Sequence, residues 1–223
     1  MIPLVKIMSM QEAVCCLHAQ SSIMVGGFGN IGNPKGLINK IADSDLSELT
    51  VIANDLGTPN VGLGRWVRGG KITKAIGTYF TYNPEAAQLY YEKKLELEMV
   101  PQGTFAEAMR AGGSGIGGFY TQVGVGTELT KDAEIREFDG KAYVFVRPLR
   151  ADFALLHAKK ADERGNLVYD KTARNFNPLM AMAAKYTIVE VEEIVPAGSL
   201  SPEEIVTPFI FVDVLVPVER GDA

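Results

Sequence analysis

The fold class follows from the stretch Ile23-Met24-Val25-Gly26-Gly27-Phe28-Gly29-Asn30-Ile31-Gly32-Asn33-Pro34. Its first three residues form a short apolar run that stops at two glycines, a pattern typical of a buried parallel strand. Pro34 suits the first turn of a helix, which we expect to continue to Ala42. A strand, a glycine-rich turn and a helix in succession are the repeating unit of an α/β protein.

The same alternation continues along the 223 residues, and no repeat or low-complexity linker interrupts it. Capping boxes at Ser9–Glu12, Thr104–Glu107 and Ser201–Glu204 and the Asn-Pro pair at Asn83 predict helix starts. Seven further apolar runs predict strands: 49–53, 74–77, 97–100, 141–146, 153–158, 186–191 and 209–216. We expect the run 141–146 to form one arm of a hairpin. We therefore predict a single α/β domain over residues 1–223, with a mostly parallel open sheet flanked by helices.

Composition excludes several classes of function. The chain is 47% hydrophobic and carries a net charge of −5, which favours a folded core and offers no basic excess for nucleic acid. No apolar run reaches the roughly 18 residues of a membrane span. The adjacent Cys15 and Cys16 do not suit a disulfide scaffold, and His18 and His157 lack neighbours at metal-ligand spacing. Without an export signal, we expect a soluble cytoplasmic protein that binds no metal.

The glycine-rich segment Gly26–Gly32 is the first candidate binding site. It follows a strand end, where open α/β sheets bind ligands, and glycines let backbone N–H groups approach phosphate or carbonyl oxygens. A tight turn without a ligand is the alternative. Gly27–Gly32 also matches the dinucleotide fingerprint, with Asp55 downstream. We interpret that match as a coincidence, because Pro34 disfavours a helix at Asn33 and the last fingerprint glycine belongs inside the helix.

A second candidate is the turn around Gln102. Pro101 and Gly103 hold this side chain between a strand end and a capped helix, and a primary amide there can donate to a developing oxyanion. A surface turn residue is the alternative. The glycine-rich run 110–127 suits a mobile lid, an anion nest or a flexible connection. The segment 173–178 could shape a pocket, although a helix N-cap explains Asn177.

Taken together, the chain resembles the α subunit of family I CoA-transferases, most closely the bacterial acetate, acetoacetate and butyrate branch. The stretches that carry the resemblance span nearly the whole chain. They are Ile23–Phe28 with Gly32 and Pro34, Val100–Thr104, Arg110–Gly113, Arg147–Asp152, Arg174–Leu179 and Val189–Glu193. Two positions depart from the pattern of that family: Ala19-Gln20 before the first strand, and Phe209 where bacterial relatives often have glycine.

The resemblance implies the fold shared by CoA-transferases and sugar-phosphate isomerase-like proteins, and a CoA transfer that is active only with a β subunit. Gln102 would be the oxyanion donor, and CoA would be a substrate, with no prosthetic group. The residues implied to line the CoA side of the cleft are Gly26, Gly27, Phe28, Gly29, Asn30, Ile31 and Gly32.

The resemblance also implies that the nucleophile is a glutamate of the β subunit, in an α2β2 assembly. No equivalent motif occurs in this chain, where Glu107 suits a helix cap and Glu190, Glu192 and Glu193 suit a strand end.

Two other functions stay open at this point. One is a single-chain sugar-phosphate isomerase or deaminase, whose chemistry requires a general acid/base that two isolated histidines supply poorly. The other is a non-catalytic acyl-CoA-binding module that docks a regulator through the apolar segment 209–216.

Overall fold

The main sheet is parallel and open, as the sequence predicts. The computed structural model describes residues 4–218, and its strands lie in the order β1-β12-β11-β9-β2-β3-β4-β5, every neighbouring pair parallel. The short β10 (Leu167–Val168) pairs antiparallel with β9. The strand bounds are β1 Lys6–Ile7, β2 Ser22–Val25, β3 Leu49–Ile52, β4 Ile72–Gly77, β5 Glu96–Met99, β9 Ala151–Asp162, β11 Ala184–Val195 and β12 Val214–Pro217.

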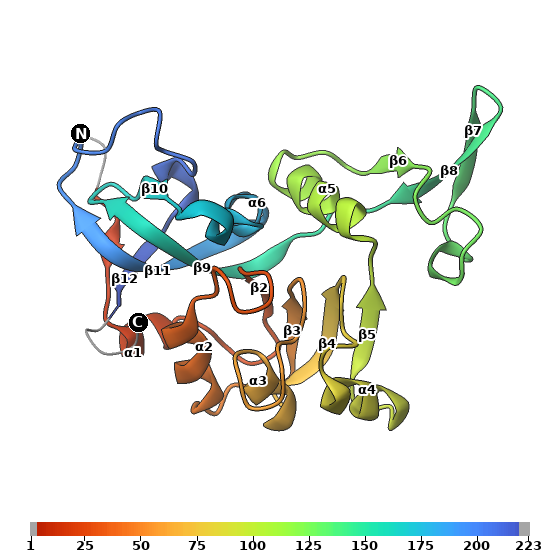
Figure 1. The fold of residues 1–223 in the computed structure, drawn as a ribbon, viewed down its shortest axis with the longest axis horizontal. Helices are drawn as coiled ribbons and strands as arrows, with labels where there is room; N and C mark the ends of the chain where they lie inside the picture. The colour runs from red at the N-terminus through yellow and green to blue at the C-terminus, as the bar shows by residue number, and fades with distance from the viewer. Residues whose placement is uncertain (1–3, 219–223) are drawn as a thin grey trace.

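Helices cover both faces of this sheet (Figure 1). One face carries α1 (Met10–Val14), α2 (Lys35–Ala42), α3 (Gly64–Arg68) and α4 (Pro84–Tyr91), and the other carries α5 (Gln102–Gly113) and α6 (Asn177–Ala183). The side chains of β2 alternate between the two cores: Ile23 and Val25 pack on the first face and Met24 on the second. This period of two explains why continuous apolar runs mark the strands.

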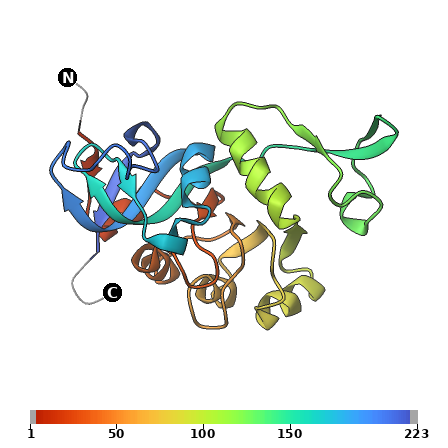
Figure 2. The same cartoon turned by 45° about the horizontal axis from the view of Figure 1, so that its top comes forward.

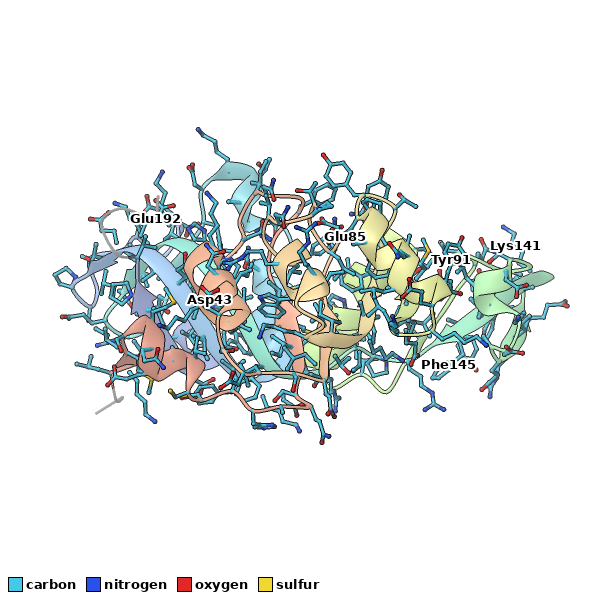
Figure 3. All side chains as sticks on the ribbon, turned by 90° about the horizontal axis from the view of Figure 1, so that it is seen from below. Asp43, Glu85, Tyr91, Lys141, Phe145 and Glu192 are labelled. Carbon is cyan, nitrogen blue, oxygen red and sulfur yellow. The ribbon has the colours of Figure 1, made fainter. Side chains whose placement is uncertain are left out.

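A second, smaller sheet extends away from the main body beyond α5 (Figure 2). It is antiparallel in the order β6-β8-β7, with β6 Phe119–Thr121, β7 Ile135–Phe138 and β8 Lys141–Val146. Figure 3 shows Lys141 and Phe145 of β8 at the end of the molecule opposite to Glu192 of β11. Part of the glycine-rich run 110–127 therefore forms an ordered strand, β6. The organisation of the chain as a single domain stays a prediction.

Several local predictions are confirmed. Ser9 and Glu12 form a reciprocal capping box at α1, and Asn83 caps α4 by accepting from the N–H groups of Glu85 and Ala86. The pair β7–β8 forms the hairpin expected around residues 141–146.

Other predictions are wrong. Residues 201–204 form one isolated turn instead of a helix, because the hydrogen bond from Glu204 N–H to the Ser201 carbonyl is not continued. The predicted strand over 209–216 begins with the 3₁₀ turn η3 (Phe209–Phe211), so that only its second half pairs, as β12. The capping box at Thr104 is also absent: α5 begins two residues earlier, at Gln102, and Thr104 is buried inside its first turn. Glu107 instead forms an ion pair with Arg110.

Candidate functional site

The glycine loop joins the carboxyl end of β2 to the start of α2. Gly27, Gly29 and Gly32 have φ values of +128°, +57° and +74°, a left-handed region that favours glycine. Between them, Phe28 and Ile31 exchange backbone hydrogen bonds of 3.0 and 3.2 Å, which closes a tight turn. The helix α2 begins only at Lys35, so that all three glycines lie outside it, as Pro34 predicts.

Two asparagines from a distant segment hold this loop in place. Asn175 Oδ1 accepts the Gly27 N–H at 3.1 Å, and Asn175 Nδ2 donates to the Ile31 carbonyl at 3.0 Å. Asn177 Nδ2 donates to the Gly32 carbonyl at 3.1 Å. The expected N-cap role of Asn177 is wrong, because Phe176 occupies that position and Asn177 is fully buried against the loop. The side-chain amides of Asn175 and Asn177 therefore fix the conformation of the glycine loop.

Gln102 lies at the first position of α5, just after β5, and its side chain points to the neighbouring strand ends. Its Nε2 donates to Asn54 Oδ1 at 2.8 Å. Asn54 Nδ2 donates to Asp55 Oδ2 at 2.8 Å, and the same carboxylate oxygen accepts the Gly29 N–H at 2.8 Å. A continuous hydrogen-bonded chain thus connects Gln102 with the glycine loop.

These groups line a hollow of about 450 Å³. Its walls are Phe28, Gly29, Asn30, Asn54, Asp55, Thr78, Tyr79, Tyr82 and Gln102. An adjoining hollow of about 360 Å³ shares Gly29, Asn30 and Asp55 with it and also contains Lys35 and Asn33. The structure therefore brings Gln102 together with three of the seven predicted loop residues. Gly26, Gly27, Ile31 and Gly32 line neither hollow and build the turn instead.

Four of the lining residues are not predicted from the sequence: Asn54, Thr78, Tyr79 and Tyr82. A fifth, Asp55, is singled out only by the fingerprint match that we interpret as a coincidence. Asn54 and Asp55 directly follow the predicted strand at 49–53, and Thr78 directly follows the predicted strand at 74–77. Because the carboxyl ends of parallel strands meet at one edge of a sheet, polar residues at these positions are the signal that could have found them.

Carboxylates around the site are already engaged. Asp55 is 8% exposed, and its carboxylate accepts N–H groups from Gly29, Gly57 and Asn54. Glu107 lies outside both hollows, and the Arg110 guanidinium that donates to it lowers its pKa. Among the described residues, Asp55 is therefore the one acidic side chain that lines either hollow.

The three glutamates that the sequence assigns to a strand end, Glu190, Glu192 and Glu193, lie in β11. Glu190 is buried and accepts the Leu37 N–H at 2.9 Å, whereas Glu192 lies 3.3 Å from His157 Nε2. Burial lowers the pKa of His157, which favours the neutral imidazole. None of the three glutamates of this strand, Glu190, Glu192 and Glu193, lines either hollow.

Residues 4–218 contain no group of three or more His, Cys, Asp and Glu side chains placed to hold a metal ion. Within the same part of the chain, no helix has both the length and the apolar character needed to cross a membrane.

Known proteins match this chain over most of its length. The family model described as Coenzyme A transferase matches residues 7–217. The chain is 46% identical over 208 residues to one subunit of a probable succinyl-CoA:3-ketoacid coenzyme A transferase of Bacillus subtilis, covering 93% of this chain and 87% of that protein. It is 41% identical over 211 residues to the alpha subunit of acetate CoA-transferase from Escherichia coli, covering 95% and 96%.

A likeness in fold extends to a solved acyl-CoA transferase from Escherichia coli O157:H7, with a TM-score of 0.87 at 22% identity. The alignment covers 96% of this chain but 47% of that one, so the chain spans about half the length of this structural relative.

Proposed function

This chain belongs to the coenzyme A transferase family, and we propose that it is the α subunit of an enzyme that moves CoA between short-chain acyl-CoA and carboxylic acids. The proposed acids are of the acetate, acetoacetate and butyrate class. The matched relatives are themselves named as single subunits, one of them as an alpha subunit, which supports a partner β subunit. We propose an α2β2 assembly of the two.

One observation carries this proposal: a primary amide and a glycine loop face one hollow whose only lining carboxylate, among the described residues, is already hydrogen-bonded. The Gln102 amide can donate to a developing oxyanion without carrying charge. Asp55 accepts three N–H groups and is nearly buried, so it is poorly placed to attack a substrate. These contacts support a nucleophile that comes from another molecule.

We propose that a glutamate of the β subunit supplies it. Its carboxylate attacks the acyl-CoA thioester, which forms an acyl-glutamyl anhydride and releases CoA thiolate. The thiolate then attacks the glutamyl carbonyl of the anhydride, giving a glutamyl-CoA thioester and releasing the first carboxylic acid as its carboxylate. An acceptor carboxylate reverses the sequence and leaves with CoA.

Each of these attacks places negative charge on a carbonyl oxygen. Gln102 would donate its remaining N–H to that oxygen from the wall of the hollow. Removal of one such donor costs about 10²–10³ in kcat, or roughly 3–4 kcal/mol of transition-state stabilisation. The loop residues Phe28, Gly29 and Asn30 would line the CoA side of the same space.

The rim of the hollow supports a site that is completed by a partner. Phe28, Tyr79 and Tyr82 line it and are 51%, 53% and 57% exposed. Aromatic side chains that are half-exposed around a polar site commonly become buried in an interface. Enclosure by a β chain would exclude water from the reacting thioester.

The test is CoA transfer from acetoacetyl-CoA to acetate, measured for this chain alone, for its co-expressed β chain alone and for the complex. We expect activity only in the complex, with a glutamyl-CoA thioester detected by mass spectrometry on the β chain. The variant Gln102→Ala should lower kcat of the complex about 10²–10³-fold. Robust activity of this chain alone, or a thioester on one of its own side chains, would contradict the proposal.

A further inference from the structure

Asn54 occupies a position between Gln102 and Asp55 that determines how the Gln102 amide is oriented. The residue is 3% exposed, so its side chain has little access to a substrate in the hollow. Its Oδ1 accepts from Gln102 Nε2 at 2.8 Å, and its Nδ2 donates to Asp55 Oδ2 at the same distance. Both ends of the Asn54 amide therefore have a defined partner.

The Asp55 carboxylate gives this arrangement its direction. It accepts the N–H groups of Gly29 and Gly57 in addition to the Asn54 Nδ2–H group. A carboxylate that accepts three N–H groups has no hydrogen to donate, so it selects the nitrogen end of the Asn54 amide. The oxygen end of Asn54 must then face Gln102.

The backbone of Asn54 is also held firmly. Its carbonyl oxygen accepts the N–H groups of Thr78 at 3.1 Å and Tyr79 at 3.0 Å, which connects the segments after β3 and β4. The Thr78 hydroxyl group lies 3.0 Å from Asn54 Oδ1 and 3.1 Å from the Asn54 carbonyl oxygen, and its single hydrogen can be donated to either oxygen. A flip of the Asn54 amide would therefore place its nitrogen against the Gln102 Nε2 donor.

For Gln102 the consequence is a fixed polarity. With Nε2 toward Asn54, one of its two hydrogens is used, and the second has no hydrogen-bond acceptor among residues 4–218. If the Gln102 amide were reversed, its Oε1 would lie against Asn54 Oδ1, an unfavourable approach of two acceptors. Gln102 would then present an oxygen atom to the substrate.

We propose that Asn54 and Asp55 are positioning residues that hold the Gln102 amide with an N–H, not an oxygen, toward the reacting carbonyl. This inference rests on the proposed oxyanion role of Gln102. Asp55 Oδ2 also accepts the Gly29 N–H, so the same pair fixes the glycine loop relative to Gln102. Preorganised donors of this kind need no reorientation when charge develops.

The test is a double-mutant cycle on kcat in the complex with the β chain. We expect Asn54→Ala to lower kcat about 10–100-fold, since a donor that is present but misoriented retains part of its effect. The KM for acyl-CoA should change less than about threefold, because substrate binding does not depend on this donor. In the Gln102→Ala background, Asn54→Ala should change kcat by less than about threefold, because residues that act as a unit are non-additive.

Asp55→Asn is the second variant and carries the test if Asn54→Ala does not assemble. It preserves the size of the side chain but replaces one carboxylate oxygen by an amide donor, so residue 55 is no longer acceptor-only and no longer selects the nitrogen end of Asn54. We expect this variant to lower kcat in the otherwise wild-type complex. In the Gln102→Ala background we expect no further decrease.

Asn166→Ala is the matched control. Asn166 donates to Asp162 at 2.8 Å, a second Asn–Asp pair, but neither residue lines the hollow. We expect this variant to retain kcat within about twofold, because a loss of fold stability alone does not lower transition-state stabilisation.

Three outcomes separate the positioning role of Asn54 and Asp55 from the oxyanion role of Gln102. Full effects of Asn54→Ala and Asp55→Asn in the Gln102→Ala background would overturn the positioning role while leaving the proposed function intact. So would wild-type kcat in both single variants. Wild-type kcat in Gln102→Ala itself would overturn the oxyanion role and the positioning role together.

Discussion

Gly26 offers a direct test of how the glycine loop is packed. It follows the last residue of β2, and a Cβ atom added there would lie 1.9 Å from Asn177 Oδ1 and 2.8 Å from Asn177 Cγ. Both distances are far below van der Waals contact. The variant Gly26→Ala therefore requires the buried Asn177 side chain to move.

The cost follows from the hydrogen bonds that Asn177 would lose. Its Nδ2 donates to the carbonyls of Gly32 at 3.1 Å and Ala173 at 2.9 Å, and its Oδ1 accepts the His157 N–H at 3.2 Å. At about 1 kcal/mol each, loss of the three would lower the free energy of unfolding by about 3 kcal/mol. This corresponds to a fall of about 1 M or more in the urea midpoint.

The assay is urea unfolding of the purified protein, followed by far-UV circular dichroism. Gly26→Ala, Asn177→Ala and the double variant form a cycle, in which we expect the added methyl group to cost less than about 1 kcal/mol once the Asn177 amide is gone. Gly29→Ala is the control for backbone strain alone, because nothing lies within 4 Å of its added Cβ but its φ is +57°. We expect it to cost about 1–2 kcal/mol. Additive losses in the cycle, or a wild-type midpoint for Gly26→Ala, would refute this account of the packing.

Three further variants probe the body of the fold. Asp152 accepts the N–H and hydroxyl groups of Ser22, which hold its pKa well below the usual range, so this stabilisation is present above about pH 4 and is lost as the pH falls through the lowered pKa. The destabilisation by Asp152→Asn should therefore be largest at pH 7 and should begin to decrease below about pH 4, as measured by urea midpoints at pH 7 and pH 3; an equal or larger loss at pH 3 would contradict this. His157 has a pKa lowered by burial, so the stability of the wild type should decline as the pH falls below about 6.5, and His157→Gln should flatten that slope between pH 7.5 and 5.5. An unchanged slope would show that groups other than His157 cause the pH dependence of stability. Tyr169→Phe removes a buried hydrogen bond of 2.7 Å to Thr207 and should lower the free energy of unfolding by about 1–2 kcal/mol; a gain in stability would show that the hydroxyl group is dispensable.

Local patterns predicted most of the main sheet because their causes are local. The apolar run 23–25 alternates between two cores, which requires only a strand covered on both faces. Pro34 placed the start of α2 after the glycines through a steric effect on its own neighbour. The capping prediction at Thr104 failed because Pro101 begins the helix first: its carbonyl accepts the Phe105 N–H at 2.8 Å, which leaves Thr104 inside the turn.

The sequence by itself determined the parallel α/β architecture and the family, and it identified Gln102 and the glycine loop as candidate site residues. It did not identify Asn54, Tyr79 or Tyr82 as part of the same site, nor the support of the loop by Asn175 and Asn177. Those groups come from loops 26 to 148 residues apart along the chain, for example Gly29 and Asp55, or Gly27 and Asn175. Gly29, Asp55 and Tyr79 meet only because parallel pairing aligns the carboxyl ends of β2, β3 and β4 at one edge, a register that depends on the packing of the whole sheet.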